Sequence, residues 1–141
     1  MAKGRKNRIQ TPAANEGKNV QAKDPPDFDK RPPKFSLEKL QDGKFCFSSL
    51  SNECKRQFSE AMFVRRTMTW SEMRSAGRHG LGYEKISKSA IRAPIPPFIT
   101  EEVSQLIAFR YNGKRAMVGY RIQDIFYVLW FDSKFKLYDH G

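Results

Sequence analysis

The end of the sequence carries two side chains suited to acid catalysis, Tyr138 and His140, separated by one residue. Histidine titrates near neutral pH and tyrosine is a phenol donor, so either could protonate the leaving 5′ oxygen when the adjacent 2′-hydroxyl cleaves RNA. In an extended strand both side chains would point to one face, so we expect them to act together or not at all. The alternative is a frayed chain end with His140 in water.

Two arginines, Arg110 and Arg121, could stabilise the charge on the phosphorane without a metal ion. They flank the Asn112-Gly113 pair, which is a strong signal for a tight hairpin turn. With regular alternation Arg121 shares a face with Gly119, and a long cation beside a glycine suggests space for a ligand above the sheet. We therefore assign Arg121 to the catalytic set and Arg110 to the RNA-binding set. The alternative for each is an ion pair with an acidic residue on a solvated face.

Residues 78–86 combine glycines with charged side chains. The glycines let the backbone approach a partner closely, and the basic groups around them could hold phosphate. Glu84 is a possible general base. The side chains that we expect to bind RNA are Arg78, His79, Lys85, Arg110 and Lys136. The alternative is a loop whose glycines only serve turn geometry and whose charges are solvated, because no GxGxxG or Walker pattern occurs.

Two helices are predicted before this loop. Ser51 can cap the first helix, whose apolar residues recur at helical spacing to about residue 66. Thr69 and Glu72 match a capping box for a second, shorter helix, which Gly77 ends.

The other elements are predicted to be strands. Residues 125–131 are apolar on both faces, which is typical of a central strand, and their burial would place residues 135–140 as the strand that closes the sheet. The predicted strands are residues 44–48, 104–111, 115–122, 125–131 and 135–140. The order is β, α, α and then an antiparallel meander of three or four strands, which indicates an α+β fold.

Composition separates an N-terminal arm from the folded domain. Residues 1–35 contain five of the eight prolines and four large apolar residues after Met1, too few to offset their conformational entropy. We predict a disordered, basic, Pro-rich arm at 1–34 and one α+β domain at 35–141. The net charge of +11 divides into +5 for residues 1–35 (nine Lys and Arg minus four Asp and Glu) and +6 for the rest (17 minus 11). The domain itself therefore attracts polyanions, unless the charge serves solubility alone.

Some classes of protein and site are not expected. Cys46 and Cys54 do not have the spacing of a zinc site, and we expect neither a metal ion nor a cofactor. The N-terminus lacks the apolar region of a signal peptide, and the longest apolar run, residues 125–131, is too short to cross a bilayer. We therefore expect a cytoplasmic protein with no membrane partner.

With these residues in view, the chain resembles the RelE/ParE superfamily of bacterial type II toxins. The resemblance covers about residues 35–140 and includes the size, the basic charge, the β-α-α-β-β-β order and the sequence Gly119-Tyr120-Arg121 before residues 125–131. It implies a RelE-like α+β fold, β-α-α-β-β-β-β, with two helices packed on a mainly antiparallel, twisted sheet.

The resemblance also implies a function. YoeB- and HigB-like members are metal-independent endoribonucleases that cleave mRNA, often on the ribosome, inhibit translation and are silenced by a cognate antitoxin. In this resemblance Arg121 matches the phosphate-stabilising arginine of the family. Tyr138 and His140 lie where YoeB-like members carry a terminal His or Tyr acid. Glu84 or Lys85 would fall near the family's base or basic cluster. The long arm, the glycine loop and the proline-rich crossing at residues 94–97 depart from the pattern. A non-catalytic protein that binds nucleic acid or the ribosome, and a ParE-like inhibitor of a topoisomerase, are the alternatives.

Overall fold

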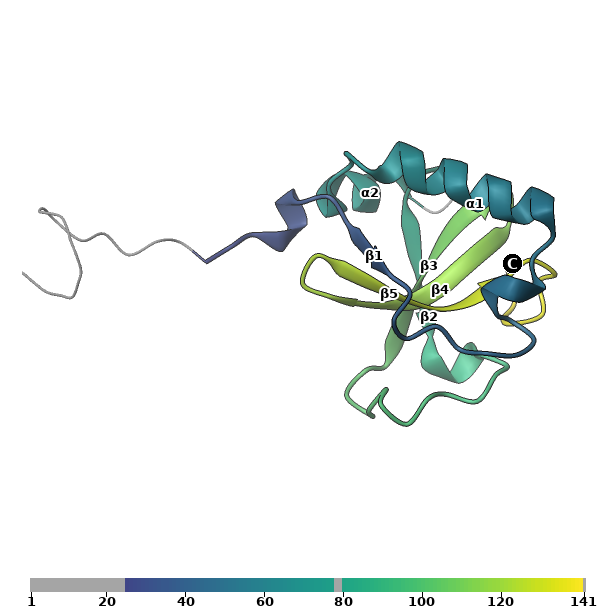
Figure 1. Ribbon diagram of the computed structural model, residues 1–141. Coiled ribbons are helices and arrows are strands. Elements are labelled where there is room, and N and C mark those ends of the chain that lie inside the picture. Colours follow the sequence, from purple (N-terminus) through teal and green to yellow (C-terminus); the bar gives the residue numbers. More distant parts are fainter. Residues whose placement is uncertain (1–24, 78–79, 141) are drawn as a thin grey trace, which may run out of the picture.

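The computed structural model describes residues 25–77 and 80–140, which form a five-stranded sheet with two α-helices over one face (Figure 1). The strand order is β1-β5-β4-β3-β2, with β1 parallel to β5 and the other neighbours antiparallel. The predicted α+β class is confirmed. In chain order the elements are η1 (Phe28–Lys30), β1 (Lys34–Ser36), η2 (Phe47–Ser49), α1 (Asn52–Arg65), α2 (Trp70–Ala76), β2 (Tyr83–Ser87), η3 (Lys88–Ala90), β3 (Gln105–Asn112), β4 (Arg115–Ile122) and β5 (Ile125–Asp132).

The helices begin where their caps predict. The Ser51 hydroxyl accepts a hydrogen bond from the Cys54 amide, and Thr69 and Glu72 form the complete capping box of α2. Gly77 follows α2 with φ +74°, a conformation that favours glycine. These local interactions set the start of both helices and the end of α2.

The predicted strand at residues 44–48 is wrong. This segment is a turn followed by η2, and the first strand of the sheet is β1. The Phe47 ring packs edge-on against Phe58 and Phe131, at centroid distances of 5.5 Å and 5.3 Å. Phe47 is therefore partly buried against the core without any need for the segment to join the sheet.

The predicted closing strand at residues 135–140 is also wrong. The free edge of β5 is taken by β1, which pairs with it in parallel. The Asp132 carboxylate accepts hydrogen bonds from the amides of Lys136 and Leu137, which turns the chain, and Phe135 has φ +61°. The C-terminal segment consequently lies across one face of the sheet. The fourth antiparallel strand is β2, which the sequence did not predict.

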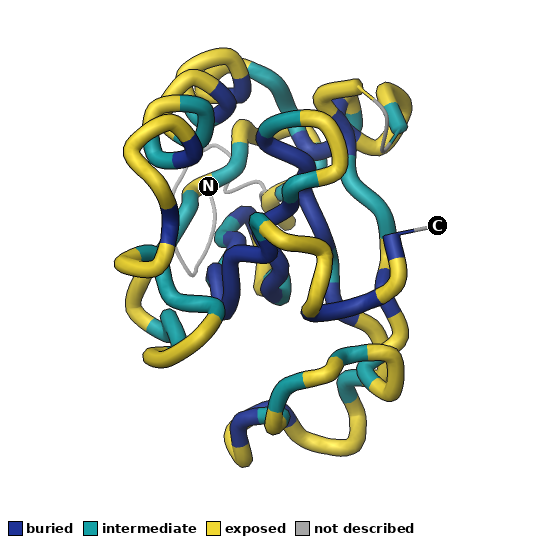
Figure 2. Tube along the Cα trace, turned by 90° about the vertical axis from the view of Figure 1, so that its right-hand side faces the viewer, coloured by how far each residue is buried: buried dark blue, intermediate teal, exposed yellow. Residues whose placement is uncertain are grey.

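The sheet is buried on both faces, as residues 125–131 predicted. Trp70, Phe109, Met117 and Phe126 belong to the core cluster under the helices. The opposite face carries a second cluster, to which the C-terminal segment contributes Tyr138. Buried residues are concentrated in the strands and exposed residues in the helices and loops around them (Figure 2).

The last residues of the predicted arm are part of the described structure. Phe28–Lys30 form η1, and Lys34 is the first residue of β1. The Trp70 amide donates to the Arg31 carbonyl at 3.1 Å, and Lys34 pairs with Asp124. Residues 1–24, the rest of that arm, lie outside the described residues.

The sheet divides into two branches at one end. The ladder between β3 and β4 runs only as far as the pair Ile107 and Gly119. Beyond it β3 continues with β2, whereas β4 continues with β5 to its hairpin turn, so the two pairs of strands separate (Figure 1). The register of β4 is irregular at Gly119, where a Cβ atom would lie 1.9 Å from the Tyr127 carbonyl oxygen. The close approach of the Tyr127 backbone therefore requires glycine at position 119. The expectation that Gly119 leaves space for a ligand beside Arg121 is wrong.

Candidate nucleic-acid interface

A cleft of about 550 Å³ lies between the two branches of the sheet. One wall comes from β2 and the start of β3, the other from the end of β4, and the loop before β3 closes one side. The described residues that line the cleft are Lys39, Lys85, Phe98, Ile99, Glu102, Val103, Ser104, Gln105, Leu106, Ile107, Tyr120, Arg121 and Ile122.

The lining combines positive charge with aromatic rings. Three of the described lining residues are cations and one is acidic. Phe98 is 45% exposed, and its ring centroid lies 6.2 Å from that of Tyr120. Tyr120 in turn stacks on Tyr127 at 5.1 Å, and the Lys39 ammonium lies 5.3 Å from the Phe98 centroid. Lys85 is exposed on β2. Cations beside accessible rings suit a ligand that has both phosphate groups and flat bases.

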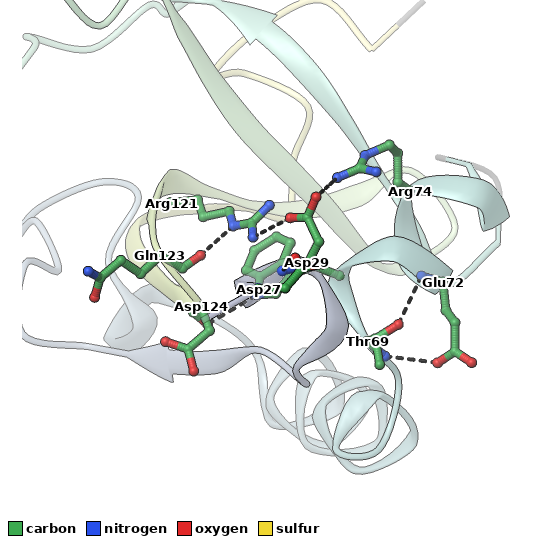
Figure 3. Close-up of polar contacts among 9 residues, drawn as sticks. Asp27, Asp29, Thr69, Glu72, Arg74, Arg121, Gln123 and Asp124 are labelled. Carbon is green, nitrogen blue, oxygen red and sulfur yellow. Dashed lines mark hydrogen bonds and ion pairs between the residues drawn. The ribbon is translucent and has the colours of Figure 1, made fainter. Parts of the chain in front are cut away.

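Arg121 is the most constrained of these cations (Figure 3). Its guanidinium lies over the Trp70 ring, 4.2 Å from the centroid, and donates to the Gln123 carbonyl and to Asp29 Oδ1, each at 2.6 Å. Trp70 is fully buried and donates through its Nε1 to the Asp124 carbonyl. The tryptophan and two acceptors therefore hold Arg121 in one place, with 19% of its side chain exposed.

The Asp29 carboxylate is shared between two arginines. Its other oxygen, Oδ2, accepts from Arg74 Nη2 at 2.8 Å (Figure 3). The hydrogen bonds from Arg74 and Arg121 hold the pKa of Asp29 below its usual value. The sequence did not predict Asp29, Arg74 and Trp70 as neighbours of Arg121, because they lie in η1 and α2, far from β4 along the chain.

Tyr138 and His140 lie together but not at the cleft. Their rings stack with centroids 4.0 Å apart and an angle of 21° between the planes. His140 Nε2 lies 2.6 Å from Asp132 Oδ2, and Tyr138 and His140 are 1% and 6% exposed. The pairing of the two side chains was predicted, whereas the alternative of a frayed, solvated end is wrong.

Glu84 and Arg110 lie on the same face as Tyr138. Arg110 Nη2 is 3.8 Å from Glu84 Oε1, and 6% and 12% of their side chains are exposed. The alternative of an ion pair is thus correct for Arg110, but the pair is buried and not solvated. Burial and the charge of Glu84 raise the pKa of Tyr138 above its usual value. Together with Asp132 and His140 these residues form a buried polar row across the sheet.

The structure does not bring the predicted catalytic set together. Arg121 packs on Trp70 under the helices, whereas Tyr138 belongs to the core cluster on the opposite face. Glu84 also points to that opposite face, while its neighbour Lys85 lines the cleft with Arg121. The sheet itself separates the proposed acid and base from the proposed phosphate-binding arginine.

The other predicted RNA-binding residues that the structure describes, Arg110 and Lys136, do not line the cleft. Lys136 is exposed and lines a separate pocket with Lys44 and Lys134. Arg78 and His79 lie outside the described residues. Lys85 is therefore the one residue of that predicted set that lines the cleft in the described part of the chain.

No family model, curated protein or solved structure matches this chain. Within residues 25–77 and 80–140, the helices are too short or too polar to cross a membrane.

Proposed function

We propose that the protein binds single-stranded RNA in the cleft between β3 and β4, without cleaving it. The observation that carries the proposal is the lining of this cleft, where Lys39, Lys85 and Arg121 accompany the exposed ring of Phe98 and the half-buried ring of Tyr120. Stacking of a base on an aromatic side chain is worth about 1–3 kcal/mol and is open only to unpaired bases. The net charge of +11 would attract RNA to the protein and make binding depend steeply on salt.

The geometry favours binding over catalysis. A general acid must come within hydrogen-bonding distance of the leaving oxygen. Tyr138 and His140 are buried on the face of the sheet opposite Arg121, and His140 is already bonded to Asp132. A phosphate held by Arg121 would therefore have neither group beside it. The mRNA cleavage implied by the RelE/ParE resemblance stays a prediction.

The resemblance supports RNA as the nucleic acid. The order β1, α1, α2, β2, β3, β4, β5, with both helices over one face, is compatible with the RelE-like fold that we propose. The ribosome and an acidic antitoxin are the further partners that this resemblance implies, and inhibition of translation would be the result of binding.

Fluorescence anisotropy with a labelled single-stranded RNA of mixed sequence tests the proposal. Phe98→Ala should raise Kd about 5- to 150-fold, the equivalent of one lost stack. Phe135→Ala is the matched control, since Phe135 is 46% exposed and lies outside the cleft. Lys85→Ala should weaken binding and reduce its salt dependence, whereas Lys136→Ala makes the same change of charge away from the cleft.

The same samples, run on a denaturing gel, test for chemistry. Intact RNA with a Kd that depends on Phe98 and Lys85 is the expected result. Equal effects of the cleft variants and their controls on Kd would show that the cleft is not the RNA-binding site. RNA cut by the wild-type protein but not by a Tyr138→Phe, His140→Ala variant whose circular dichroism shows it to be folded would establish the endoribonuclease in its place.

A further inference from the structure

The Asp29 carboxylate is held by two arginines in the way that a bound anion would be. Each of its carboxylate oxygens accepts a hydrogen bond from a different arginine, Oδ1 from Arg121 at 2.6 Å and Oδ2 from Arg74 at 2.8 Å. The two arginines come from β4 and α2 and point at Asp29 from two sides (Figure 3). The Arg121 guanidinium also lies over the Trp70 ring. A phosphate group presents oxygens that two guanidinium groups can bind in the same way.

The segment that carries Asp29 is lightly attached. None of the residues of η1 is buried, and 38% of the Asp29 side chain is exposed. The hydrogen bond from the Trp70 amide to the Arg31 carbonyl holds the chain just after η1. Segments with little buried apolar surface open locally at low free energy. Asp29 can therefore leave the arginines without loss of the core.

The two arginines differ in what holds them when Asp29 leaves. Arg121 stays over Trp70 and bonded to the Gln123 carbonyl, so its position would be kept. Arg74 is 54% exposed on α2, has its side chain directed at Asp29 (Figure 3), and would keep only its hydrogen bond with the Tyr83 side chain. One fixed and one adjustable guanidinium would then share a single anion.

We infer that Arg121 and Arg74 form a binding site for one phosphate group of RNA, and that Asp29 occupies this site as an internal competitor. The inference rests on the proposed function, because Arg121 also lines the cleft and would connect the phosphate site to it. Bound RNA displaces the Asp29 carboxylate and takes over its hydrogen bonds. Because an anion must compete with Asp29 for the two arginines, an isolated anion that binds weakly does not displace the carboxylate.

The first test compares two variants of the full chain that make the same change of charge. Asp29→Asn should lower the Kd for the labelled RNA at least about fivefold more than Asp42→Asn, whose carboxylate lies in an exposed turn. Adding Arg74→Ala to Asp29→Asn should abolish this gain. Adding Arg56→Ala should leave it, since Arg56 is as exposed as Arg74 and is likewise ion-paired on a helix.

The second test needs no RNA and uses inorganic phosphate as the probe. In the Asp29→Asn protein, the ¹⁵N NMR signals of Arg121 and Arg74 Nε should shift saturably on addition of phosphate, against sodium chloride of the same ionic strength. The wild-type protein should show a much smaller shift at the same concentrations.

The outcomes separate the two proposals. Equal RNA affinities of the Asp29 and Asp42 variants, with no saturable phosphate shift, would overturn the two-arginine site even if the cleft variants still weaken RNA binding. A saturable shift of both arginines in a protein that binds no RNA would support the anion site and remove the proposed function.

Discussion

The imidazole of His140 lies 2.6 Å from the Asp132 carboxylate on the face of the sheet opposite Arg121. Asp132 is fully buried, and it also accepts the amides of Lys136 and Leu137. The pair thus fastens the C-terminal segment over the second core cluster. From this position the pair stabilises the fold and does not face the cleft.

Removal of His140 should destabilise the protein without a matching loss of RNA binding. His140→Ala leaves a buried Asp132 oxygen with one hydrogen-bond partner fewer, so we expect about 1–3 kcal/mol less free energy of unfolding. Urea denaturation measures this loss. Lys136→Ala, which changes an exposed side chain next to the same turn, should cost less than about 0.5 kcal/mol. A His140→Ala protein that is folded but cannot bind RNA would contradict the structural role.

Gly119 should tolerate no side chain. In Gly119→Ala the new Cβ would lie 1.9 Å from the Tyr127 carbonyl oxygen, so β4 or β5 must move, at a cost of about 3 kcal/mol or more. Gly113→Ala is a useful comparison, because Gly113 has φ +57° but open space around it. It should cost only about 1–2 kcal/mol from backbone strain. Thermal unfolding of the two variants measures both losses of stability. Equal losses would mean that β5 does not approach β4 at Gly119 as closely as the structure shows.

Acid should release Asp29 from its two arginines. The pKa of Asp29 is lowered by Arg74 and Arg121, so the unfolded state binds a proton more readily than the folded state. The stability from this contact is complete above the ordinary value of about 3.8 and is lost as pH falls through the lower, folded pKa. Unfolding curves recorded from pH 6 to 2 should therefore show a smaller acid-induced loss in Asp29→Asn than in the wild type. The hydrogen bond with Lys34 also lowers the pKa of Asp124. Protonation of Asp124 should therefore destabilise both proteins alike and account for the acid-induced loss that remains in Asp29→Asn.

Two tyrosines should resist ionisation in alkaline solution. Burial raises the pKa of Tyr138, with the charge of Glu84 as a further cause, and burial raises that of Tyr111 as well. Because the folded state prefers the neutral phenol, these contacts lose stability only when pH rises above the ordinary tyrosine value of 10. The tyrosinate absorbance of Tyr138→Phe should therefore match that of the wild type up to the pH at which the protein unfolds. A smaller amplitude near pH 10 in the variant would show that Tyr138 is accessible.

Features that depend on near neighbours in the chain could be predicted from the sequence. The caps at Ser51 and Thr69 act over three residues, and both were found where expected. The Asn112-Gly113 turn brings together strands that are adjacent in sequence, and the apolar run 125–131 predicts its own burial. The hydrophobic pattern and short-range hydrogen bonds were sufficient in each case.

Features that depend on competition between distant segments could not. Whether β1 or residues 135–140 pairs with β5 is decided by which segment reaches that edge, and the chain placed β1 there. The contact between Arg121 and Asp29 joins residues 92 apart. The sequence by itself determined the α+β class, the helix starts and a basic, aromatic-rich chain. Only the tertiary structure decided that Lys85 and Arg121 share a cleft while Tyr138 and His140 lie across the sheet, because a strand's two faces acquire their neighbours only when the sheet is assembled.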